Sequence, residues 1–146
     1  MKARIFPEMP SIGPVSKGVW IVEHDYTGPT IDGNSTTVKA GFETDGASIP
    51  RLAWVIIGGK MQIPLIAAAV LHDGEYAAEL YKRSVCDWRF LVAMQALKIG
   101  WLKRNAIYSA VRAGGWIVWG RHRISDVSHA SKYVYCILPV DKLIKI

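Results

Sequence analysis

Short apolar runs alternate with turn residues in the first third of the chain. Residues 19–22 (VWIV) form one such run, and residues 35–42 (STTVKAGF) form another that is rich in β-branched residues. Between them, residues 26–34 are dense in Gly, Pro, Asn and Asp, which favour turns. The pattern predicts a small antiparallel sheet or hairpin. Residues 43–51 contain Gly, Ser and Pro and are predicted to form an irregular loop.

After Pro64 the apolar residues follow the spacing of a helix. Proline itself is favourable in the first turn of a helix. Apolar and aromatic residues recur at steps of three and four over residues 65–80 and predict the first helix. A second helix is predicted over 84–100, with Ser84 as its N-cap. A third is predicted over 102–115, followed by an apolar, Trp-rich segment.

The end of the chain returns to a strand pattern. Residues 133–138 (YVYCIL) are a strand candidate that Pro139 stops. The sequence contains no internal repeat and no linker, so we expect one α+β domain over residues 1–146. It comprises a β-rich segment with the candidate site loop (1–50), a core of three helices (51–120) and a C-terminal extension with a possible strand (121–146).

Composition supports a folded domain. The chain has 146 residues, of which 51% are hydrophobic and 21% are charged, so it is neither a disordered tail nor a low-complexity segment. No apolar run approaches the roughly 20 residues that cross a bilayer. Residues 1–7 lack the apolar stretch of a secretion signal. We therefore expect a protein that stays in the compartment where it is made.

The net charge and the two cysteines exclude few classes of function. The net charge of +6 allows an anionic lipid, nucleic acid or acidic protein as partner, but a solvated basic face explains it more simply. No nucleic-acid reading motif is present, and the basic residues 121–123 are expected to form a solvated turn. The two cysteines, Cys86 and Cys136, make neither a disulfide framework nor a zinc motif and are expected to be buried thiols.

Polar residues capable of catalysis gather on the first predicted helix. His72 and Asp73 are adjacent, so their side chains diverge by about 100° and serve different neighbours. Tyr76 lies one turn on from His72. If the second helix packs against the first, Asp87 approaches the imidazole of His72. A carboxylate on one ring nitrogen fixes the tautomer and leaves the other nitrogen as a general base.

A cation site is the second possibility that these residues suggest. Asp73 and Asp45 carry the hard oxygen ligands that calcium prefers, and the carbonyl of Gly46 is a further candidate ligand. Each residue also has a structural alternative. Asp45 can stabilise a turn, Asp87 can act in a capping box with Ser84, His72 can be a hydrogen-bonded structural residue, and Tyr76 can be core.

The order of these motifs resembles a family of small proteins from tailed bacteriophages and prophages. The resemblance covers about residues 41–119. It rests on residues 41–51 (GFETDGASIPR), 71–76 (LHD-x-x-Y), 83–94 (R-x-x-x-D-x-x-F-x-x-x-M) and 108–115 (Y-x-x-V-R-x-x-G). It implies a phage protein without implying an activity.

The same motifs are similar to the core of secreted phospholipases A2, especially the compact bacterial type. That resemblance implies a three-helix core in which His72 activates water, Asp87 orients it and Tyr76 hydrogen-bonds to Asp87. It also implies a calcium ion held by Asp45, Asp73 and the carbonyl of Gly46.

One departure from the phospholipases concerns helix pairing. Glu75 stands where they usually have a cysteine whose disulfide ties the long helices together. The helices here are therefore expected to be held by packing alone. Glu75 itself is expected either to add a ligand to the cation site or to disturb its electrostatics.

The leading expectation is a calcium-dependent, phospholipase A2-like ester hydrolase that acts on the host membrane during penetration or lysis. The alternatives are a non-catalytic virion component of the tail, neck or baseplate, and a small host-interaction protein. Each of them places the chain in the host cytoplasm when it is synthesised. Whether it is then incorporated into the virion or acts as a free protein in the host cell is left open by the sequence. The exposed rings of some of its six tryptophans would serve either a lipid or a protein contact.

Overall fold

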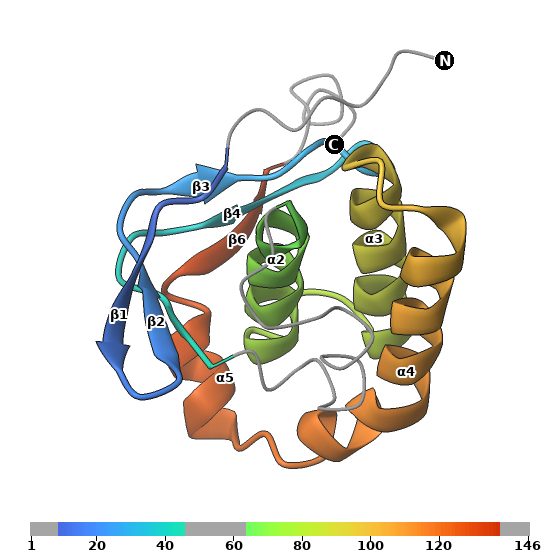
Figure 1. The fold of residues 1–146 in the computed structure, drawn as a ribbon. Coiled ribbons are helices and arrows are strands. Elements are labelled where there is room, and N and C mark those ends of the chain that lie inside the picture. The colour runs from blue at the N-terminus through green and yellow to red at the C-terminus, as the bar shows by residue number, and fades with distance from the viewer. Residues whose placement is uncertain (1–8, 46–63, 138–146) are drawn as a thin grey trace, which may run out of the picture.

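The computed structural model describes residues 9–45 and 64–137, which form an α+β fold, as predicted. Figure 1 shows two small sheets on one side of the central helix α2 and two further helices on the other. In chain order the elements are β1 (Ile12–Ser16), β2 (Val19–Val22), β3 (Tyr26–Thr27), β4 (Ser35–Val38), β5 (Glu43–Thr44), α2 (Leu65–Ala77), α3 (Arg83–Ala96), α4 (Trp101–Trp119), α5 (Ile124–Ala130) and β6 (Val134–Ile137).

Both sheets are antiparallel and three-stranded, with orders β1-β2-β5 and β3-β4-β6. The strand predicted at 19–22 is present as β2, and the strand predicted at 133–138 is present as β6, which pairs with β4. The strand predicted over 35–42 ends earlier, at Val38. The chain turns at Gly41, whose φ of +95° strongly favours glycine. It then continues as β5 in the other sheet, so Glu43 and Thr44 belong to a strand rather than to the predicted loop.

The first three described helices lie where the sequence predicts them, but their ends differ. Lys82, in an extended conformation, occupies the N-cap of α3, so the prediction of Ser84 as the cap is wrong. The predicted end of the third helix at 115 is also wrong, because α4 continues to Trp119. Gly115 is buried in that helix, and this packing outweighs the low helix propensity of glycine.

Helix α5 is not predicted by the sequence pattern. It has only seven residues, too few for a clear periodicity, and it begins with a capping box in which Asp126 accepts a hydrogen bond from the backbone N–H of Arg123. The basic segment before it is the turn that the sequence predicts, with Arg121 and Arg123 exposed.

Helix α2 is the centre of the fold because it is packed on both sides. One hydrophobic cluster joins it to the β3-β4-β6 sheet, and another joins it to α3 and α4. Gly74 permits the close approach to the sheet, since a Cβ there would lie 3.0 Å from a methyl group of Val38. The polar residues of α2 are therefore buried with the apolar ones: His72, Asp73, Glu75 and Tyr76. Buried polar groups need partners inside the protein.

No helix within residues 9–45 and 64–137 is long and apolar enough to cross a membrane.

Candidate functional site

Asp87 of α3 lies directly against His72 of α2. Its Oδ1 atom is 3.0 Å from Nε2 of the imidazole, and both side chains are 0% exposed. The connection between the two helices is short, residues 78–82, and it keeps α3 beside α2. The contact that the sequence spacing predicts between these residues is therefore present. Asp87 does not act as a helix cap, so the capping-box alternative for it is wrong.

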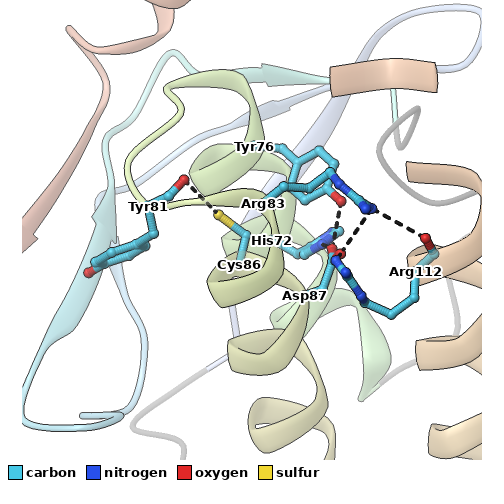
Figure 2. A network of polar contacts seen from close by, with 7 residues as sticks. All are labelled: His72, Tyr76, Tyr81, Arg83, Cys86, Asp87 and Arg112. Carbon is cyan, nitrogen blue, oxygen red and sulfur yellow. Dashed lines mark hydrogen bonds and ion pairs between the residues drawn. The ribbon is translucent and has the colours of Figure 1, made fainter. Parts of the chain in front are cut away.

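Three further side chains donate hydrogen bonds to the carboxylate of Asp87 (Figure 2). Tyr76 donates its hydroxyl to Oδ1 at 2.6 Å, so this oxygen is shared with His72. Arg112 of α4 donates Nη1 to Oδ2 at 2.6 Å, and Arg83 donates to the same oxygen at 3.4 Å. Arg83 Nη1 also donates to the backbone carbonyl of Arg112 at 3.3 Å, which links α3 to α4.

These donors keep Asp87 ionised. Burial by itself raises the pKa of this carboxyl, but the hydrogen bonds from His72, Tyr76 and Arg112 outweigh it, and the pKa of Asp87 is lowered. The hydrogen bond to Asp87 in turn raises the pKa of Arg112. For Tyr76, burial first and then the neighbouring Asp87 raise the pKa, so the phenol stays protonated and donates.

An ionised Asp87 determines the tautomer of His72. Because a carboxylate only accepts hydrogen bonds, the hydrogen of the neutral imidazole lies on Nε2, facing Asp87. The lone pair is then on Nδ1. This arrangement is the one that a histidine general base requires.

Aromatic rings fix the position of the imidazole. Phe90 stacks on His72 at 4.6 Å between ring centroids with an angle of 24°, and Tyr76 lies 4.4 Å away. Trp119 meets the ring of Tyr76 edge-on at 5.1 Å. Gly115 leaves room for the tyrosine hydroxyl, since a Cβ at that position would lie 2.5 Å from it. The C-terminal part of α4 therefore packs against Tyr76 and holds it beside Asp87.

The predicted cation ligands come together only in part. The hydroxyl of Thr44 at the end of β5 donates a hydrogen bond to Oδ2 of Asp73, which is 8% exposed. Asp45 is the next residue and is exposed. Gly46 lies outside the described residues. Within 9–45 and 64–137 no three His, Cys, Asp or Glu residues form a group that could hold a metal ion. Calcium takes six to eight oxygen ligands, and among the described residues Asp45 and Asp73 are the predicted carboxylate candidates for it.

Glu75 lies on a different side of α2 from Asp73 and neither adds to the cation site nor faces it. Its Oε1 atom accepts hydrogen bonds from Nε of Arg89 at 2.9 Å and from the hydroxyl of Thr36 at 2.7 Å. Arg89 is on α3, so this buried pair joins the two helices. The expectation that packing alone holds them is therefore wrong. Within the described residues Glu75 does not join Asp73 as a ligand, because its carboxylate is paired with Arg89 and Thr36.

The cysteines take no part in this arrangement. Cys86 is buried as predicted, and burial raises the pKa of its thiol well above the ordinary value. Its sulfur contacts the backbone carbonyl of Tyr81 at 3.6 Å (Figure 2). Cys136 is also a free thiol, but it is only half-buried, so the expectation that both thiols are buried is wrong for it.

Arg83 and Arg112 stand in the motifs that carry the resemblance, but their contacts with Asp87 are not predicted from the sequence. Arg83 precedes Asp87 by four residues on one helix, which is a recognisable ion-pair spacing. Arg112 comes from another helix, 25 residues further along the chain, and no local pattern links it to Asp87.

Comparison with known proteins adds a family but no activity. The chain is 34% identical over 93 residues to the "Uncharacterized protein y4jT" of Sinorhizobium fredii (strain NBRC 101917 / NGR234). The match covers 62% of this chain and 27% of that protein, so the chain spans about a quarter of the relative's length. No solved structure matches. The family model described as "Protein of unknown function (DUF1353)" matches residues 20–111, which include His72, Asp73, Tyr76 and Asp87, and the chain belongs to this family.

Proposed function

We propose that this protein is an ester hydrolase that uses His72 as its general base and acts on phospholipid. The observation that carries the proposal is the pair of hydrogen bonds to Oδ1 of Asp87, from His72 at 3.0 Å and from Tyr76 at 2.6 Å. A purely structural histidine does not require a buried, ionised carboxylate that is itself held by two arginines.

The proposed reaction begins when Nδ1 of His72 takes a proton from water. The water oxygen forms a bond to the ester carbonyl carbon, and Asp87 stabilises the imidazolium that results. When the tetrahedral intermediate collapses, the ester C–O bond breaks and the imidazolium returns its proton to the leaving alkoxide. The products are a fatty acid and a lysophospholipid. Arg83 and Arg112 act on Asp87 and not on the substrate, so they are positioning residues.

Phospholipid as the substrate rests on the resemblance to phospholipases A2. The net charge of +6 also favours approach to an anionic bilayer. Calcium is proposed as the cofactor on the same resemblance. Asp45 and Asp73 are its described ligand candidates, and no step of the reaction above is assigned to the ion. A place in bacteriophage infection or lysis is likewise a proposal that rests on the resemblance to phage proteins.

Product analysis tests this function. Vesicles of phosphatidylglycerol are incubated with the purified chain at calcium concentrations from zero to several millimolar, and the products are identified by mass spectrometry. The proposal expects equal amounts of fatty acid and lysophospholipid, with release increasing as calcium is added. A folded protein that releases no fatty acid at any calcium concentration would overturn it.

A second candidate function is a non-catalytic role in a particle such as a phage tail, neck or baseplate. A specific observation favours it, because the exposed residues of α4 are all uncharged and several are large. Trp101 is 67% exposed, Leu102 is 77% exposed and Trp116 is 62% exposed. Aromatic side chains of this kind are common anchors of protein contacts. This function expects stoichiometric amounts of the chain in purified particles and unchanged assembly when His72 is replaced.

A further inference from the structure

A cleft of about 410 Å³ opens beside α2, where β5 and α5 approach its C-terminal end. Figure 1 shows these three elements next to one another. Phe42, Glu43, Ala77, Asp126, His129 and Tyr133 are among its lining residues. None of them bonds to Asp87, so the cleft is separate from the His72 centre. It nevertheless lies near the hydrogen-bonded pair of Asp73 and Thr44. Ala77 is one helical turn from Asp73, and Glu43 precedes Thr44.

The inner surface of the cleft is polar and apolar in about equal parts, and its apolar part includes aromatic side chains. Phe42 and Ala130 are each only 6% exposed. The ring of Tyr133 packs against Gly41, where a Cβ would lie 3.0 Å from the ring carbon Cε1. The ring of His129 lies 5.5 Å from that of Tyr133 at an angle of 54°. Tyr133 is therefore held in place as one wall, with His129 beside it.

The charged residues that line this cleft are both acidic. Glu43 and Asp126 are exposed, and no Lys or Arg is among the lining residues. The chain as a whole carries a net charge of +6, so a cleft whose charged lining residues are both acidic differs in sign from the protein's overall charge. One carboxylate oxygen of Asp126 accepts the capping hydrogen bond from the backbone of Arg123, at 3.1 Å, which restrains this side chain.

We propose that this cleft binds an organic ammonium group, such as the choline or ethanolamine part of a larger molecule. Carboxylates supply the opposite charge, and an aromatic wall attracts the alkylated cation through its ring face. The volume fits a small molecule. A bare metal ion fits less well, because the described residues contain no group of three His, Cys, Asp or Glu ligands. The cation has two sources: a free amine, or the headgroup of a zwitterionic phospholipid.

Binding is tested on the intact chain by titration with tetramethylammonium, followed by NMR. The expected result is a saturable shift of the backbone amide signals of Glu43, His129 and Tyr133. The neutral isostere 3,3-dimethyl-1-butanol has the shape of choline without its charge and is expected to cause no such shift. Equal shifts with both molecules would overturn the proposal, and so would no shift with tetramethylammonium.

Variants then identify the groups that bind. Glu43→Gln and Tyr133→Ala are each expected to weaken binding about two- to fivefold, the effect of roughly 0.5–1 kcal/mol for such a contact. Tyr133→Phe keeps the ring and is expected to bind as the wild type does. Asp32→Asn removes one exposed carboxylate in a distant turn and serves as the control. Unchanged affinity in both Glu43→Gln and Tyr133→Ala would contradict the proposed contacts.

Short-chain lipids that stay monomeric in water distinguish the two sources of the ammonium group. Dihexanoyl-phosphatidylcholine is compared with choline and with dihexanoyl-phosphatidylglycerol, which has no ammonium group. Tighter binding of the phosphocholine lipid than of choline identifies the headgroup, and equal binding identifies the free amine; both outcomes support the cleft as an ammonium site. Stronger shifts with the phosphatidylglycerol lipid would overturn it. These measurements use binding alone and can be made in a His72→Asn background, so they stand apart from the proposed hydrolysis.

Discussion

Oε1 of Glu75 lies 2.9 Å from Nε of Arg89, and the two side chains are 3% and 4% exposed. Arg89 also donates to the backbone carbonyls of Ile31, at 2.9 Å, and Asn34, at 3.4 Å. The pair therefore joins α2, α3 and the turn between β3 and β4. In this chain it links the two helices that present His72 and Asp87.

Replacing Glu75 by Gln is expected to destabilise the fold by about 3–5 kcal/mol, because the guanidinium of Arg89 stays buried without its counter-charge. Chemical denaturation measures this change. Glu79→Gln is the matched control, since Glu79 is exposed and pairs with His122, at 3.1 Å. It is expected to cost no more than about 1 kcal/mol. Similar losses in the two variants would show that the buried pair has no special role in stability.

Gly115→Ala is expected to displace Tyr76 from its position beside Asp87. The added Cβ would lie 2.5 Å from the hydroxyl of Tyr76, so the tyrosine has to move away from Asp87. A loss of about 1–3 kcal/mol in unfolding free energy is expected from this overpacking. Gly100→Ala adds the same atom at the N-cap of α4, where nothing lies within 4 Å, and is expected to cost less than about 1 kcal/mol, the effect of alanine at an N-cap. If both variants unfold at the wild-type denaturant concentration, Gly115 is not required for the packing of Tyr76.

Acid is expected to remove the contribution of Asp87 to stability. Its pKa in the folded state is lowered from the ordinary 3.8, so its stabilisation is complete above that value and is lost as pH falls through the lower, folded value. The difference in unfolding free energy between the wild type and Asp87→Asn should therefore shrink as pH falls from about 5 to about 2. Denaturant titrations at several pH values measure it. A difference that stays constant over this range would contradict the lowered pKa.

The sequence predicts the parts of the site that local spacing controls. His72 and Tyr76 are four residues apart on one helix, and Asp87 follows after a short connection, so their contact is accessible to pattern reasoning. The contact of Arg112 with Asp87 depends on how α4 packs on α3. Contacts between helices that are far apart in the sequence leave no regular spacing of residues from which they could be predicted.

Glu75 illustrates the same limit. Its position beside Asp73 in the sequence suggests a role in the cation site, but on a helix the residue two positions on faces away. Its partner Arg89 is 14 residues further along the chain. The strand order of the two sheets, in which β6 joins β4, is equally a long-range outcome.

We propose that His72, oriented by Asp87, is the base of a hydrolytic reaction. The most direct measurement is the initial rate of fatty-acid release from phosphatidylglycerol vesicles by the wild type, His72→Asn and Asp87→Asn, with circular dichroism to establish that each is folded. We expect release by the wild type and a loss of about 10²- to 10⁴-fold in both variants. Release at the wild-type rate by folded His72→Asn would contradict it.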